Sequence, residues 1–107
     1  MRLTKDADKL ICMIYADYKK KRADGMSKEK AKRIGSSKSV QQSIVPKWSF
    51  EDVDDTFREL DRAGMLHCFY ADNVVYSASI TDECIIKMEN RFPDGLASIL
   101  DFVSKFL

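Results

Sequence analysis

Apolar residues recur at two different spacings along this chain, and each spacing predicts a different kind of element. Over residues 4–24 they return every three or four positions, which is typical of one face of a helix. Residues 65–80 are rich in aromatic and branched side chains and are interrupted only by Asp72-Asn73, which indicates a β-hairpin with a two-residue turn. Apolar periodicity and flanking turn residues predict further helices over residues 27–34, 36–45, 49–63, 81–91 and 94–107. Thr4, Ser27, Ser49 and Thr81 are the expected N-caps, because each hydroxyl can accept a backbone N–H of the first turn.

The hairpin pattern also predicts which side chains enter the core. An uninterrupted two-residue turn places alternate residues on opposite faces of the two strands. One face then holds Phe69, Ala71, Val74, Tyr76, Ala78 and Ile80, and the other holds Cys68, Tyr70, Val75, Ser77 and Ser79. We expect the first, more apolar face to pack in the core. Trp48, Phe69, Tyr70 and Tyr76 could alternatively stack on nucleic-acid bases, but core positions explain them more simply.

The order of these elements predicts one mostly helical α+β domain over residues 1–107. Helices followed by a helix-hairpin unit are typical of a winged helix-turn-helix, here with a β-hairpin wing and two C-terminal helices. The helix over residues 49–63 would occupy the position of the recognition helix, and residues 65–80 would form the wing.

Two segments resemble a known family. Residues 49–66, SFEDVDDTFRELDRAGML, and residues 80–92, ITDECIIKMENRF, resemble the small bacterial and phage winged-helix proteins of the YjcQ family. With the final apolar helix, the resemblance covers roughly residues 36–107. It implies a winged-helix fold and an origin in a phage, prophage or mobile element. It implies no catalytic residues and leaves the function open.

Charge is segregated along the chain although the total is only +1. Residues 19–47 contain ten basic residues and two acidic ones, whereas residues 48–107 contain five basic residues and twelve acidic ones. Ten cations in 29 positions exceed what helix C-termini use to complement their dipoles. The segment therefore predicts phosphate contacts to double-stranded DNA by nine candidates: Lys19, Lys20, Lys21, Arg22, Lys28, Lys30, Lys32, Arg33 and Lys38.

The helix over residues 49–63 argues against ordinary base reading, because it carries six acids and two bases. An alternative function is therefore a protein-interaction module whose acidic face engages a basic partner or another copy of the chain. The candidate residues are Glu51, Asp54, Asp55, Arg58, Asp61 and Arg62. The two charged halves could also join head to tail in a homo-oligomer. The broad apolar arc of the last helix predicts either a groove in its own domain or a homodimer interface.

No arrangement of residues points to catalysis, a metal or a cofactor, so we expect a non-enzymatic binding protein. His67 and Cys68 are adjacent, but successive strand residues point to opposite faces and cannot form a dyad with each other. The three cysteines are widely spaced without a CxxC pair, which favours the reducing cytoplasm and small core residues. The longest apolar run is too short for a membrane span, so we expect no membrane partner.

Overall fold

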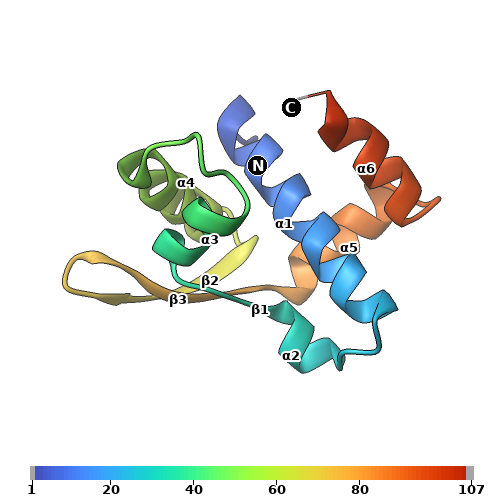
Figure 1. The fold of residues 1–107 in the computed structure, drawn as a ribbon, viewed down its shortest axis with the longest axis horizontal. Helices are drawn as coiled ribbons and strands as arrows, with labels where there is room; N and C mark the ends of the chain where they lie inside the picture. The colour runs from blue at the N-terminus through green and yellow to red at the C-terminus, as the bar shows by residue number, and fades with distance from the viewer. Residues whose placement is uncertain (1, 106–107) are drawn as a thin grey trace.

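Helix α1 (Lys5–Ala23) passes through the middle of the molecule, and other elements pack around it (Figure 1). The structure is a computed structural model that describes residues 2–105. Leu10, Ile11, Ile14 and Tyr15 of α1 are fully or almost fully buried, as expected from their spacing on one helical face. They contribute to a single apolar core that receives side chains from the strands and from the other helices.

Five further helices surround this core, and their starts follow the predicted caps. Thr4, Ser27, Ser49 and Thr81 each accept a backbone N–H of the first helical turn through the side-chain oxygen, so these predictions are confirmed. The helices are α2 (Lys28–Lys32), α3 (Ser37–Ser43), α4 (Phe50–Arg62), α5 (Asp82–Arg91) and α6 (Leu96–Ser104). Residues 106 and 107, which the predicted last helix included, lie outside the described residues.

A short strand was not predicted. The predicted helix over residues 27–34 ends at Lys32, and Arg33–Gly35 forms β1, which pairs antiparallel with β3 (Val74–Ile80). Gly35 has a φ of 88° and therefore adopts a backbone conformation that a glycine tolerates best. A segment of three residues is too short to show the alternation of apolar and polar positions that identifies a strand. Its hydrogen-bonding partner, β3, also lies far along the chain.

The hairpin is confirmed, with β2 (Leu66–Ala71) and β3 joined by Asp72-Asn73. Both turn residues have positive φ, 50° and 65°, as a tight hairpin turn requires. The strand order in the antiparallel sheet is β1-β3-β2. The described chain is thus an α+β structure of six helices and a three-stranded sheet.

The predicted assignment of hairpin faces is wrong in part, because the hairpin contains a β-bulge. Phe69 pairs with Ser77 but the next residue, Tyr70, pairs with Val75, so Tyr76 is an extra residue. The bulge shifts the alternation by one position. The buried set is Leu66, Cys68, Val75, Ala78 and Ile80. Phe69 and Tyr76, both predicted in the core, are exposed.

Helices α3 and α4 pack on the buried face of the sheet. Helix α1 lies between α4 and α6, and α5 and α6 pack on the side of α1 away from α3 and α4 (Figure 1). In Figure 1 the α1 C-terminus and α2 lie at the lower right of the molecule, and the hairpin turn lies at the left end of the long axis. This arrangement separates the most basic part of the sequence from the acidic helix α4.

Candidate nucleic-acid interface

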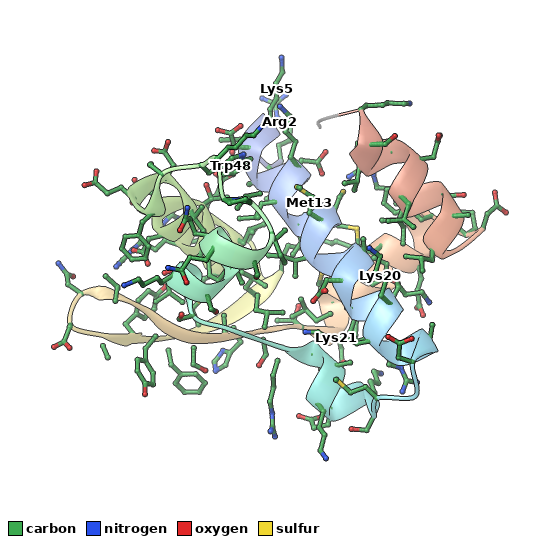
Figure 2. The ribbon with its side chains drawn as sticks, viewed as in Figure 1. Arg2, Lys5, Met13, Lys20, Lys21 and Trp48 are labelled. Carbon is green, nitrogen blue, oxygen red and sulfur yellow. The ribbon has the colours of Figure 1, made fainter. Side chains whose placement is uncertain are left out.

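The basic candidates of α1 and α2 lie together at one end of the molecule. Helices α1 and α2 are in contact and are joined by a tight turn in which Gly25 has a φ of 94°. The Arg22 Nη1 atom donates to the Met26 carbonyl oxygen over 3.1 Å, which closes this turn. Figure 2 shows Lys20 and Lys21 on the part of α1 that approaches α2. We call residues 19–22 and 28–33 the cationic end.

Three cations of this end are already paired with acids. Lys21 Nζ lies 3.0 Å from a carboxylate oxygen of Asp17, one turn earlier in α1. Lys32 Nζ donates to Asp82 Oδ1 over 2.9 Å, and Lys28 Nζ lies 3.8 Å from the same oxygen. The hydrogen bond to Asp82 raises the pKa of Lys32, and the same bond lowers the pKa of Asp82. These three cations are less available to a ligand than the sequence suggests.

The remaining cations of this end form no ion pair within residues 2–105. Lys20, Lys30 and Arg33 are exposed, and Lys19 and Arg22 border an open hollow of about 440 Å³. Ala23, Gly25, Met26, Ser27 and Leu96 complete the lining, so no acid contributes to it. Phosphate oxygens could approach these side chains without displacing an acidic partner, although Arg22 also donates to the Met26 carbonyl oxygen. The unpaired candidates of the cationic end are Lys19, Lys20, Arg22, Lys30 and Arg33.

Lys38, the last predicted phosphate contact, lies away from this end. It is exposed on the first turn of α3 and borders a separate hollow of about 460 Å³. Phe50, Val74 and Tyr76 line the same hollow. The nine candidates therefore do not form one patch, because the chain reverses through β1 between Arg33 and Lys38.

Asp54, predicted on the interacting face of α4, is instead part of the interior. It is only 7% exposed, and its Oδ1 atom accepts from the Val75 backbone N–H over 2.9 Å and from Ser37 Oγ over 2.7 Å. Strand β1 pairs with β3 only at Ala78 and Ser79, so Val75 lies beyond its reach. Val75 pairs with Tyr70 of β2 on one side, and Asp54 and Ser37 satisfy its backbone N–H and carbonyl on the side that β1 does not reach.

The same carboxylate holds Arg58, whose Nε donates to Asp54 Oδ2 over 3.0 Å. Burial would raise the pKa of Asp54, but the hydrogen bonds from Val75, Ser37 and Arg58 outweigh burial and lower it. The Asp54 side chain is therefore held as a carboxylate. Its burial makes it a poor contact for an external partner.

Arg58 and Asp61 fasten the hairpin to α4. Arg58 Nη2 donates to the Asn73 carbonyl oxygen in the hairpin turn over 2.6 Å, and its guanidinium lies over the Tyr70 ring. The Tyr70 hydroxyl donates to Asp61 Oδ2 over 2.6 Å. Glu51, Asp55 and Arg62 are the members of the predicted interacting set that stay exposed without such a contact among residues 2–105.

The apolar arc of the last helix is largely used inside the molecule. Ile99 and Val103 are buried, and α6 packs along α1. Phe102 lies 5.7 Å from the Phe92 ring and under the Arg91 guanidinium. The described part of α6 thus occupies a groove of its own chain. A homodimer through this helix stays a prediction.

The cysteine thiols lack the features of nucleophiles. Cys12, Cys68 and Cys84 are free and buried, and burial raises their pKa values to about 11, about 12 and about 12. His67 is exposed while Cys68 faces the core, so the expected opposite orientation is confirmed. Within residues 2–105, no group of three or more His, Cys, Asp or Glu side chains could hold a metal ion. None of the helices described is long and apolar enough to span a bilayer.

Comparisons with protein-family models, with curated proteins and with solved structures find no match for this chain. The resemblance to the YjcQ family therefore stays a prediction.

Proposed function

We propose that this protein is a winged helix-turn-helix DNA-binding protein, used in transcriptional regulation, that contacts duplex phosphates through its cationic end. The element order α1, α2, β1, α3, α4, β2, β3 and the strand order β1-β3-β2 support this interpretation, with α3 and α4 as the helix-turn-helix and β2–β3 as the wing. The fold supports DNA as the ligand only by analogy, because one fold can serve many functions. The residues of the site supply the more specific support.

The observation that carries the proposal is a contrast between cations that have no acidic partner and cations that other groups already hold. Lys19, Lys20, Arg22, Lys30 and Arg33 have no acidic partner within residues 2–105 and lie on adjoining elements. In α4, which would read bases in an ordinary winged helix, Arg58 is held by Asp54 and by the hairpin. Strands β2 and β3 contain no Lys or Arg that could contact phosphates from the wing.

Fluorescence anisotropy with a labelled random duplex at low salt tests this proposal. We expect binding that weakens steeply as salt rises, because each phosphate contact contributes a slope of about 0.9 in a plot of log affinity against log salt. Lys20→Ala combined with Lys30→Ala should reduce the affinity and lower the slope by about 1.8. Lys87→Ala with Lys105→Ala is the matched control, since it removes two exposed lysines from other elements. Absent binding at micromolar protein, or binding that ignores salt, would contradict the proposal.

A second function is favoured by the exposed acids of α4. Glu51, Asp52 and Asp55 lie on its solvent side, and the N-terminal turns of α4 carry no cation. This surface could engage a basic protein or the cationic end of a second copy. Glu51→Lys with Asp55→Lys should abolish such contacts while leaving the Asp54 hydrogen bonds intact. Light scattering at low and high salt tests the second-copy case, and a salt-insensitive monomer would rule it out.

A further inference from the structure

One face of the sheet is left without a helix to cover it. Helices α3 and α4 contact the sheet from the side of Leu66, Cys68, Val75, Ala78 and Ile80, which are buried. By register the opposite side carries Arg33, His67, Phe69, Ser77 and Ser79, and the exposed bulge residue Tyr76 lies at its edge, beside Ser77. We call this set, with Tyr76, the outer face. In Figure 1 no helix lies along β2 and β3 on the side away from α3 and α4.

The outer face presents aromatic rings to solvent. Phe69 is 58% exposed and Tyr76 is 69% exposed, and the His67 ring meets Phe69 edge-on at 5.0 Å between centroids. The residues paired with His67 and Phe69 on β3 are Ser79 and Ser77. These small cross-strand neighbours leave the rings uncovered. Neither Phe69 nor Tyr76 belongs to the apolar core.

Cations lie at the borders of this sheet. Strands β1, β2 and β3 contain no Asp or Glu, and the one acid of the hairpin, Asp72, lies in its turn. Arg33 pairs across the sheet with Ser79, which in turn pairs with His67, so a cation lies in the same row as the aromatic pair. Beyond the end of β1, Lys38 lies around the edge of β3 on the α3 side, where it lines a hollow with Tyr76 and Phe50. Both cations are exposed and belong to the basic segment of the sequence.

We infer that the outer face binds single-stranded DNA, with Phe69 and Tyr76 stacking on unpaired bases and Arg33 and Lys38 contacting the flanking phosphates. Aromatic platforms edged by cations bind single strands, because every base offers a flat ring and every linkage a negative charge. Bases inside a duplex are already stacked and cannot use the platform. A second copy docking by the same face would bring two cationic borders together, so charge favours the nucleic acid.

This inference rests on the proposed function, since it assumes DNA as the ligand, and it names the kind of DNA. Arg33 belongs to both the cationic end and the outer face. The two surfaces are therefore continuous. A junction between duplex and single strand would place paired phosphates on the cationic end and unpaired bases on Phe69 and Tyr76.

The test compares two fluorescein-labelled probes, an oligo-dT of about ten nucleotides and a blunt duplex of similar length. Phe69→Ser with Tyr76→Ser should weaken oligo-dT binding by about 5- to 150-fold for each stacked base lost, and should leave duplex affinity unchanged. Ile86→Ser is the matched control, because Ile86 is 51% exposed on α5, away from the sheet. Urea midpoints of the variants check that the fold is kept.

The outcomes separate the two proposals. Unchanged oligo-dT binding by the double variant, with duplex binding intact, would overturn the outer face alone. Failure of the wild type to bind duplex, with aromatic-dependent binding of oligo-dT, would overturn the duplex site and support the outer face. A wild-type dimer that becomes monomeric in the double variant, with no oligo-dT binding, would show that a second copy covers the face and would overturn the inference.

Discussion

The cationic end and helix α4 carry opposite charge, but they differ more in what their charged groups contact. At the cationic end, Lys19, Lys20 and Lys30 have no acidic partner within residues 2–105. In α4, Asp54, Arg58 and Asp61 are bonded to strand backbone, the hairpin turn and Tyr70. A count of charges along a sequence therefore overstates how much charge α4 offers to a partner. Of the two regions, the cationic end leaves most of its cations without an acidic partner among residues 2–105.

The largest expected effect is on the α4 side of this comparison. Asp54→Ala leaves the Val75 N–H buried without an acceptor, removes the shorter hydrogen bond of the Ser37 hydroxyl and removes the acidic partner of Arg58. We expect a loss of about 2–4 kcal/mol in the free energy of unfolding. The neighbouring Asp55→Ala removes an exposed acid and should change it by less than about 0.5 kcal/mol. Urea denaturation measures both, and equal effects would show that Asp54 is a surface residue.

The pH dependence of stability should follow from the same carboxylate. Because folding lowers the pKa of Asp54, its contribution is fully present above the unfolded pKa of about 3.9 and is lost as pH falls through the lower folded value. The stability gap between the wild type and Asp54→Asn should therefore be widest near neutral pH and shrink below about pH 4. Chemical denaturation of both proteins over this range measures the gap. A stability gap that widens in acid would contradict the lowered pKa of Asp54.

Features that depend on neighbouring residues could be predicted from the sequence, whereas features that depend on distant residues could not. Local chemistry predicted the four helix caps and the Asp72-Asn73 turn, because each depends on residues a few positions apart. The bulge at Tyr76, strand β1 and the burial of Asp54 depend on partners distant in sequence. Asp54 and Asp55 look alike in the chain, and only the position of Val75 distinguishes them. Phe69 and Tyr76 were assigned to the core for the same reason, since an uninterrupted hairpin would have placed them there.

A smaller effect distinguishes the two exposed tyrosines of the hairpin. Tyr70→Phe removes the hydroxyl bonded to Asp61 and should cost about 0.5 kcal/mol, at the low end for a partly exposed hydrogen bond. Tyr76→Phe removes a hydroxyl on the open outer face and should leave stability unchanged, while keeping the ring for stacking. Thermal unfolding of the two variants beside the wild type makes the comparison. An equal loss for both would argue that the hairpin is not fastened through Asp61.

The most direct measurement for the central claim is the salt dependence of duplex affinity for Lys20→Ala with Lys30→Ala, set beside Arg62→Ala. Arg62 is the exposed arginine of α4, so its loss reports on base reading by that helix. If the cationic end contacts the phosphates, the lysine variant loses about 1.8 of the slope and Arg62→Ala keeps the wild-type slope and affinity. The opposite result is a wild-type slope for the lysine variant and weak binding by Arg62→Ala. It would show that α4 contacts the duplex and would contradict the assignment of the phosphate contacts to the cationic end.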